Sequence, residues 1–396
     1  MTKRAFLKQL GIFAAASPFM GTLLASCDEK EGFYPQFNLD FDGKVLIIGA
    51  GAAGLTAGHI LRQQGIDFDI LEASAIHGGR VKKATNLADF PIDLGAEWIH
   101  TDPSILAKLN NDRNSMANID IITYNPQTIA VWRNDKLRQR NFARHFYSEY
   151  KFKHSTWYDF FDELMVPHFR DKIVYNSPVT GIDYTGSRVV VTTQNGGTYE
   201  GDRVLITVPI TILQSEFITF SPALPSWKRE AIQEERMPGG VKVFIEFSER
   251  FYPDMVMLDN LFAAAADGDH TYYDAAFGKD AERHVFALFT VGDKAEPYTS
   301  LETDEAIFTR VMSELDEMFD GKASQHYLQH EVQNWTREPF IRGSYSHGWG
   351  TPETLAQPVA DRLYFAGEAT APNGNTSTVH GAAESAYEAL RLMLEG

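Results

Sequence analysis

The sequence has a single cysteine, Cys27, among its 396 residues, which excludes any disulfide within one chain. Basic residues are also few: 36 lysines and arginines stand against 53 acidic residues, and the net charge is −17. This balance argues against a nucleic-acid partner and is compatible with a cationic substrate. Internal repeats and low-complexity tracts are absent from the sequence. At this length the chain can bury a large core, and we expect two interleaved domains.

One uncharged stretch, residues 9–26, follows Lys3 and Arg4 near the N-terminus. It contains a proline and many small residues and is only marginally long enough to span a membrane. It therefore predicts a signal peptide, and a transmembrane anchor is the alternative. Residues 2–8 also resemble a twin-arginine export signal with lysine in place of the first arginine, which leaves the export route open.

The end of this stretch predicts attachment to a membrane. Residues 24–27 read Leu-Ala-Ser-Cys and resemble a bacterial lipobox. A lipoprotein signal peptide is therefore expected at residues 1–27, with lipid on Cys27, and residues 28–42 are expected to be a polar linker. The predicted location is the periplasm or cell envelope of a bacterium, with the chain held to a membrane by this lipid.

Three segments that follow the linker predict a βαβ unit. Residues 45–48 and 68–71 are apolar and predict buried parallel strands, with a helix at residues 52–64 between them. A further strand is expected at residues 362–365 and a final helix at residues 379–394. These elements favour an α/β fold.

The turn after the first strand carries a dinucleotide-binding motif. Gly49 permits a tight turn, Gly51 lets the backbone approach a pyrophosphate, and Gly54 allows close packing of helix on strand. The pyrophosphate would rest on the N-terminus of the helix, whose free N–H groups favour an anion. Glu72 ends the second strand, where a ribose-binding carboxylate belongs.

The middle of the chain predicts more sheet. Three segments separated by turn residues predict a β-meander: 174–182, 188–193 and 199–207. Residues 241–247 alternate with period two and predict a strand with one buried face, and residues 284–291 predict another strand. Residues 303–319 predict an amphipathic helix. Residues 104–171 mix short helix-like stretches with aromatic residues, most of which we expect in the core or at a domain interface.

Further motifs support the interpretation of the glycine-rich turn as a dinucleotide-binding motif. They are Gly78-Gly-Arg80, Ile92-Asp-Leu-Gly-Ala-Glu-Trp-Ile-His100, Trp335 with Gly343-Ser-Tyr-Ser346, Leu363-Tyr-Phe-Ala-Gly-Glu-Ala-Thr370 and Ser377-Thr-Val-His-Gly-Ala382. With these motifs the sequence resembles the flavin-containing amine oxidase family from Lys44 to Glu395. Within that family it most resembles the branch of polyamine oxidases and histone lysine demethylases.

The resemblance implies a fold class: α/β with mixed α+β character, in which a Rossmann-type FAD-binding domain is interleaved with a mixed-sheet substrate domain. The expected FAD-binding domain comprises residues 43–118, 172–208 and 331–396, and the expected substrate domain comprises residues 119–171 and 209–330. Family members usually have a longer helical part before the segment that matches the predicted meander. The substrate domain is therefore expected to be shortened, and its cavity more open or covered by a partner or membrane surface.

The resemblance also implies a site for FAD. Glu72 would contact the adenosine ribose, and Val179 would lie beside the adenine. Arg80 and Glu368 would lie near the pyrophosphate and ribityl chain. Thr378 and Val379 would lie along the isoalloxazine edge, and the dipole of the final helix would point at the flavin. The expected cofactor-binding residues are Gly49, Gly51, Ala52, Ala53, Gly54, Glu72, Ala73, Gly79, Arg80, Gly95, Ala96, Glu97, Trp98, Val179, Gly367, Glu368, Thr378 and Val379. The one cysteine is predicted to carry lipid, so the FAD is expected to be non-covalent; no metal is expected.

Four residues are expected to act on the substrate. Lys242 aligns with the family lysine that holds a water at flavin N5, although a lysine facing outward fits the alternation of its strand equally well. His100 aligns with a substrate-side histidine of polyamine oxidases. Trp335 and Tyr345 are candidates for an aromatic wall. Monoamine oxidases carry a second caging tyrosine at the position of Thr378, so selectivity for monoamines is not expected.

The implied reaction is oxidation of a C–N bond by hydride transfer to flavin N5. It gives an imine, then an aldehyde, and hydrogen peroxide when oxygen accepts the electrons. The expected substrate is a polyamine or another amine. Three alternatives stay open: a desaturase or porphyrinogen oxidase, an FAD-binding lipoprotein without turnover, and an L-amino-acid oxidase. The last needs an arginine for the substrate carboxylate, for which Arg138 and Arg342 are candidates.

Overall fold

The computed structural model describes residues 34, 37–111, 119–140, 148–258, 269–347 and 350–395. The predicted signal peptide, with Cys27, lies outside the described residues. Within the described ranges, no helix combines the length and the apolar character needed to cross a membrane.

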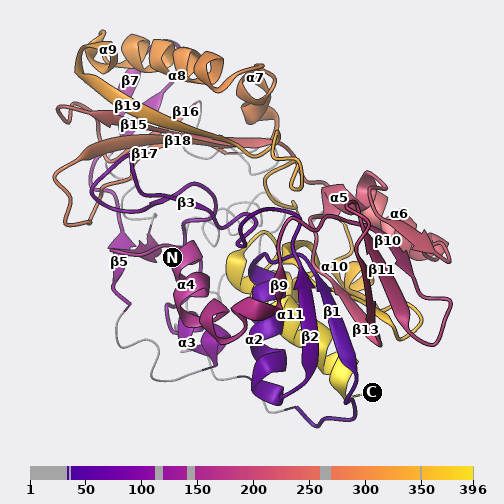
Figure 1. Ribbon diagram of the computed structural model, residues 1–396. Coiled ribbons are helices and arrows are strands. Elements are labelled where there is room, and N and C mark those ends of the chain that lie inside the picture. Colours follow the sequence, from indigo (N-terminus) through magenta and orange to yellow (C-terminus); the bar gives the residue numbers. More distant parts are fainter. Residues whose placement is uncertain are drawn as a thin grey trace, which may run out of the picture.

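A five-stranded parallel sheet forms one end of the molecule, in the order β20-β13-β1-β2-β9 (Figure 1). Its strands are β1 (Lys44–Ile48), β2 (Asp67–Leu71), β9 (Ile173–Val174), β13 (Arg203–Ile206) and β20 (Leu363–Phe365). The helices α2 (Ala52–Gln64) and α11 (Val379–Leu394) pack against each other on one face of this sheet. The predicted βαβ unit, closing strand and final helix are confirmed, because continuous apolar runs suit strands buried on both faces.

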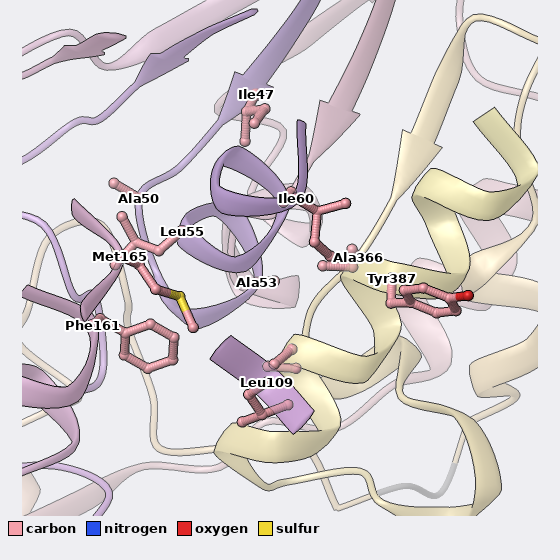
Figure 2. Close-up of a cluster of buried hydrophobic side chains, with 14 of the residues drawn as sticks. Ile47, Ala50, Ala53, Leu55, Ile60, Leu109, Phe161, Met165, Ala366 and Tyr387 are labelled. Carbon is pink, nitrogen blue, oxygen red and sulfur yellow. The ribbon is translucent and has the colours of Figure 1, made fainter. Parts of the chain in front are cut away.

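Figure 2 shows the core between this sheet and its two helices. Ile47 of β1, Leu55 and Ile60 of α2 and Tyr387 of α11 contribute to it, and all four are buried. Alternate residues of the same strands, such as Leu46, point to the opposite face and join a second cluster. The sheet is therefore covered on both sides.

The second cluster lies under a four-stranded sheet in the order β12-β11-β10-β14. Its strands are β10 (Val179–Asp183), β11 (Val189–Thr193), β12 (Thr198–Gly201) and β14 (Thr219–Ser221). The predicted meander is correct for β10 to β12 but wrong at both ends, where β9 and β13 instead join the parallel sheet. Asn176 at φ 54° and Pro178, which has no N–H to donate, separate β9 from β10.

A seven-stranded sheet forms the other end, in the order β19-β15-β18-β17-β16-β6-β7, with α8 and α9 on its outer face (Figure 1). The strands are β6 (Ile129–Trp132), β7 (Leu137–Gln139), β15 (Gly240–Phe247), β16 (Met255–Leu258), β17 (His270–Asp274), β18 (His284–Val291) and β19 (Tyr327–Asn334). The helices are α7 (Glu296–Thr299), α8 (Asp304–Met318) and α9 (Lys322–His326). The predicted amphipathic helix is confirmed, since its stripe, which includes Val311 and Leu315, packs on this sheet.

The strand β15 departs from the prediction, because all eight of its residues are buried and not only one face. Val243 and Ile245 face α8, while Phe244 points to the opposite side, into a cluster with Tyr273. Lys242 shares the side of Phe244 and is only 3% exposed, so it does not face outward. Period-two alternation identified the strand but could not show that its second face is covered as well.

The region of residues 104–171 contains the predicted short helices, α3 (Ile105–Asn110) and α4 (Trp157–Leu164), but also strands that the prediction missed. The missed strands are β5 (Ile121–Tyr124), β6, β7 and β8 (Glu149–Phe152), and β8 pairs with β5. The expected packing of aromatic residues is confirmed for Trp157, Phe160 and Phe161, which join the core of α2. The aromatic residues Phe142, Phe146 and Tyr147 lie outside the described residues.

The remaining elements are short. Within the described residues they are β3 (Lys83–Ala84), β4 (Ile92–Asp93), α5 (Ile210–Gln214), α6 (Ser226–Glu234), α10 (Pro352–Ala356) and five 3₁₀ turns at Val166–His168, Arg170–Lys172, Gly292–Ala295, Glu368–Thr370 and Pro372–Gly374. The described part of the predicted linker is not a free tether. Tyr34 stacks on Tyr387 with ring centroids 4.0 Å apart, and Phe37 and Phe41 pack on the same core.

Candidate functional site

A cavity of about 750 Å³ is lined by residues from both the five-stranded and the seven-stranded sheet. All residues predicted to bind the cofactor line this cavity except Gly54, and so do the four residues predicted to act on the substrate. These residues come from segments spread between positions 49 and 379. The fold therefore brings the predicted site residues together around one space, although their individual roles remain predictions.

One end of the cavity is formed by glycine backbone. Gly49 has φ +104°, and Gly51 precedes α2, whose first turn contains no acidic residue. A Cβ atom on Gly51 would meet nothing closer than 4.0 Å, so the N-terminus of α2 opens on free space. A Cβ on Gly54 would lie 2.0 Å from the carbonyl oxygen of Gly49, which explains why Gly54 packs behind the turn and does not line the cavity. This corner suits an anion.

Glu72 lies directly after β2 and is buried at the same end. Its Oε2 accepts a hydrogen bond from the backbone N–H of Ala50 at 2.7 Å, and its Oε1 accepts one from the N–H of Ser74 at 2.7 Å. Burial raises the pKa of Glu72, and these two N–H donors oppose that rise. The carboxylate is thus held against the glycine turn, with lone pairs left for a ligand hydroxyl.

Arg80 and Glu368 join the two ends of the sequence across the cavity wall. The Nη1 of Arg80 donates to Oε1 of Glu368 at 2.9 Å and to the carbonyl oxygen of Ser344 at 2.9 Å. The other oxygen of Glu368 accepts from Ser346 Oγ at 2.6 Å and from the backbone N–H of Ser377 at 3.0 Å. Glu368 therefore organises the surrounding loops in addition to lining the cavity.

The loop that Glu368 organises leads into the final helix. Thr378 is the N-cap of α11, and its Oγ1 accepts a hydrogen bond from the N–H of Gly381 at 3.0 Å. No acidic residue lies in the first turn, and Ser377, Thr378 and Val379 all line the cavity. The positive end of a second helix dipole is thus directed at this space. Val179, the first residue of β10, also lines it.

Buried ionisable side chains lie at the opposite end of the cavity, and we call them the Glu97 cluster: Asp93, Glu97, Lys151, Lys242 and Tyr273, of which Glu97, Lys242 and Tyr273 line the cavity. The Nζ of Lys242 donates to Asp93 O at 2.8 Å, Gly95 O at 3.1 Å and Glu97 Oε2 at 2.9 Å. The Nζ of Lys151 donates to Glu97 Oε1 at 3.0 Å, and the Tyr273 hydroxyl donates to Glu97 Oε2 at 2.5 Å. The three N–H bonds of Lys242 are therefore all matched by acceptors of the protein.

The two carboxyl groups of the cluster differ in charge. Burial alone would raise the pKa of Glu97, but the ammonium groups of Lys242 and Lys151 hold it well below the usual carboxyl range. Burial and, secondarily, the charge of Glu97 raise the pKa of Asp93 to about 8. At neutral pH the cluster therefore has an ionised Glu97 beside a protonated Asp93.

The remaining predicted substrate residues lie near this end. His100 Nδ1 lies 3.2 Å from Oε2 of Glu149, a carboxylate only 1% exposed that also lines the cavity. Trp335 is buried and donates from Nε1 to Leu94 O at 3.1 Å. The ring of Tyr345 stacks near His347, with centroids 6.1 Å apart. An acidic group and aromatic walls therefore meet in one space.

Comparison with known sequences assigns this arrangement. The sequence model of the flavin-containing amine oxidoreductases matches residues 167–394, and a model of NAD(P)-binding Rossmann-like domains matches residues 47–110. The chain belongs to the flavin-containing amine oxidoreductase family. It is therefore an enzyme that acts on amine donors, with FAD as its non-covalent cofactor.

Individual relatives agree with this assignment. The chain is 27% identical to polyamine oxidase 3 of Oryza sativa subsp. japonica over 430 positions, which cover 85% of this chain and 86% of that protein. It is 25% identical to polyamine oxidase 1 of Zea mays, with 89% and 90% covered. The first alignment is longer than this whole chain of 396 residues, so that relative has residues without a counterpart here.

A solved structure shares the fold. Cyclohexylamine oxidase from Brevibacterium oxydans IH-35A is 15% identical, with a TM-score of 0.74 over 89% of this chain and 98% of that one. At this identity the match supports a shared fold alone. It is consistent with a Rossmann-type domain joined to a domain of mixed sheet, while the residue boundaries predicted for the two domains remain a prediction.

The residues of this family member fit the flavin cofactor. An added Cβ would meet nothing closer than 4.0 Å at Gly51 and nothing within 4 Å at Gly367, so both glycines border open space. Two helix N-termini without acidic residues open on that space, and Glu72 stands at the end of β2. A volume of about 750 Å³ lies within the range of ligand sites. Within the described residues, no group of three or more His, Cys, Asp or Glu side chains is placed to hold a metal.

Sequence reasoning missed several functional candidates in this enzyme. They are Asp93, Glu149, Lys151, Tyr273, Ser346 and Ser377. The one available signal was the alternation of Glu149 and Lys151 on one side of a short aromatic segment, which places two charges on one face of a strand. That signal could not show that the face is buried.

Proposed function

We propose that this enzyme oxidises a polyamine or a related diamine. The observation that carries the proposal is the buried carboxylate of Glu149, 3.2 Å from His100, in the wall of the cavity. A polyamine bears a second ammonium group besides the amine that reacts, and a carboxylate in an otherwise aromatic space favours such a cation. The similarity to enzymes named polyamine oxidases in rice and maize supports the same substrate class.

Different residues along the cavity would bind the cofactor and exclude water from the substrate. The backbone of the Gly49–Gly51 turn and the N-terminus of α2 would hold the pyrophosphate, and Glu72 would bind the ribose. When bound, FAD would supply a two-electron acceptor for oxidation of the C–N bond, which would give an imine, then an aldehyde by hydrolysis, and hydrogen peroxide when oxygen takes up the electrons. Trp335 and Tyr345 would keep water from the reacting carbon.

Lys242 would act as a fixed positive charge. Its three N–H bonds are matched by Asp93 O, Gly95 O and Glu97. A water held by Lys242 therefore has to replace one of these acceptors or accept a shared hydrogen bond. The ammonium group lines the cavity and is buried, where its field is screened less than in water.

The amino-acid oxidase alternative lacks its arginine. Among the described residues that line the cavity, the single arginine is Arg80, which is engaged with Glu368. Arg342 does not line the cavity; its Nε donates to Pro339 O at 2.9 Å. Arg138 lies on β7 and is exposed. Among the described residues, no arginine that could bind a substrate carboxylate therefore lines the cavity.

The test is anaerobic mixing of the purified, FAD-loaded protein with a panel of amines and amino acids. Loss of the visible absorption of oxidised flavin reports reduction. We expect reduction by spermidine, spermine or putrescine and hydrogen peroxide once air is admitted. Reduction by amino acids only would instead assign an L-amino-acid oxidase, and a flavin that none of these compounds reduces would contradict the proposed substrate class.

A matched pair of amines tests the role of Glu149. In Glu149→Gln we expect KM for putrescine to rise about tenfold (~1.4 kcal/mol), with a much smaller change for butylamine, which lacks the second ammonium. An equal rise for both amines would contradict a specific contact with the second ammonium. Glu388→Gln, on the exposed side of α11, serves as the control.

We also propose attachment to a bacterial cell envelope through lipid on Cys27. The proposal rests on the Leu24-Ala-Ser-Cys27 segment, which lies outside the described residues. We expect Cys27→Ala to release the protein from membrane fractions. Continued sedimentation with membranes would favour an uncleaved anchor.

A further inference from the structure

Two ammonium groups share one carboxylate beside the cavity. Glu97 accepts from Lys151 Nζ through Oε1 and from Lys242 Nζ through Oε2, at 3.0 and 2.9 Å. Glu97, Lys151 and Lys242 are 6%, 1% and 3% exposed. One negative and two positive charges therefore meet with little exposure to solvent.

The neighbouring carboxyl group does not balance this excess. Asp93 keeps its proton at neutral pH, because burial and the charge of Glu97 raise its pKa to about 8. It is the backbone oxygen of Asp93, and not the carboxylate, that accepts from Lys242. Lys279 brings further positive charge to the same side, although burial lowers its pKa to about 8. The Glu97 cluster thus carries net positive charge.

Aromatic rings explain how the second ammonium is tolerated. The Nζ of Lys151 lies 5.3, 5.2 and 5.9 Å from the ring centroids of Trp98, Tyr124 and Tyr273, and it donates to Ala275 O at 3.2 Å. Electron-rich ring faces attract a cation and offset part of the cost of removing it from water. Lys151 itself does not line the cavity, but Trp98, Tyr273 and Glu97 do.

In a buried pair of opposite charges, each charge neutralises the other. An excess buried charge is unfavourable unless a counter-charge binds nearby. We propose that Lys151 is a positioning residue that acts through Glu97. By engaging half of that carboxylate it leaves Lys242 incompletely neutralised, so that the cavity presents net positive charge to the bound flavin. Because a hydride adds negative charge to the flavin, this charge favours the reduced form. The inference rests on flavin binding and not on the identity of the amine.

Sulfite affinity of the FAD-loaded protein tests this without any amine. Sulfite donates its electron pair to oxidised flavin and forms an anionic adduct, so its Kd reports the charge around the ring. We expect Lys151→Met to weaken sulfite binding at least tenfold and Glu97→Gln to strengthen it. The double variant Lys151→Met/Glu97→Gln should return toward wild type, because it removes one charge of each sign. A tenfold change in the two-electron reduction equilibrium corresponds to ~30 mV in midpoint potential.

Lys153→Met is the matched control. Lys153 lies two positions away on the same segment and pairs with the exposed Asp280 at 2.7 Å, so its variant should stay within twofold of wild type. A merely structural role for Lys151 predicts that the double variant is worse than either single one, and that result overturns the proposal. If Lys151→Met does not retain FAD, Glu97→Gln decides, since unchanged or weaker sulfite binding in that variant contradicts an electrostatic role. If the sulfite series behaves as expected while no polyamine reduces the flavin, only the proposed substrate fails.

Discussion

The end of the cavity beside the five-stranded sheet presents backbone, whereas the end beside the seven-stranded sheet presents buried charged side chains. At the first end, Gly49, Gly51 and two helix N-termini border the space, and each follows from a short stretch of sequence. At the second end, Glu97, Lys151 and Lys242 come from segments far apart in the chain. A cavity wall made of backbone can thus be specified locally, while a charge cluster depends on how distant strands meet.

The substitution expected to disrupt the end of the cavity beside the five-stranded sheet most strongly is Gly54→Ala. The added methyl would lie 2.0 Å from the carbonyl oxygen of Gly49, so turn and helix must separate, at a cost of about 3 kcal/mol. We expect a matching loss in the free energy of unfolding of the apoprotein and little bound FAD after purification. The control is Gly186→Ala, where the nearest contact of the new Cβ is an ordinary 3.5 Å. Wild-type FAD content in Gly54→Ala would contradict the packing role.

The second region is tested by Lys242→Met. The substitution removes one ammonium and leaves Glu97 paired with Lys151, so FAD should remain bound. We expect flavin reduction by the best amine, or its reoxidation by oxygen, to slow about a hundredfold (~2.7 kcal/mol) in stopped-flow measurements. Rates equal to those of wild type would remove Lys242 from the mechanism.

The variant Glu72→Gln tests whether a side chain contributes to FAD binding at the backbone-lined end of the cavity. An amide offers one acceptor oxygen in place of two, and its NH₂ would face the N–H of Ala50 or Ser74. We expect the Kd for FAD to rise about tenfold (~1.4 kcal/mol), measured by titration of the apoprotein. Full flavin occupancy at wild-type affinity would contradict the ribose assignment. Glu388→Gln, which changes an exposed carboxylate, should bind FAD normally.

The smallest effect, expressed per pH unit, concerns a buried lysine that has no carboxylate partner among the described residues. Lys228 donates to the carbonyl oxygens of Thr354, Leu355 and Gln357, and burial lowers its pKa to about 7. The folded state then binds fewer protons than the unfolded state above that pH, so this group makes stability rise with pH from about 7 toward its unfolded pKa. We expect the stability difference between wild type and Lys228→Met to change by at most ~1.4 kcal/mol per pH unit. A difference that is flat with pH would show that Lys228 stays charged in the folded state.

Several elements were predictable because their signals are local. The apolar runs of β1 and β2 and the glycine turn between β1 and α2 each occupy a few consecutive residues. Among the strands that the prediction missed, β5 to β8 are short and lie among polar and aromatic residues, so no period was long enough to identify them. The meander was assigned to one sheet because adjacent segments usually pair, yet β9 and β13 pair with β2 and β1 instead.

The sequence by itself determined the flavin family, the βαβ unit and most of the predicted positions that line the cavity. Glycines, the carboxylate of Glu72 at the end of β2 and the N-termini of helices act through backbone geometry that residues close in the sequence determine. Only the tertiary structure decided that Lys242 is buried, that Glu149 approaches His100, and that Lys151 shares Glu97 with Lys242. Burial and charge pairing depend on the separation between side chains of different strands, and that separation is set by the packing of whole sheets.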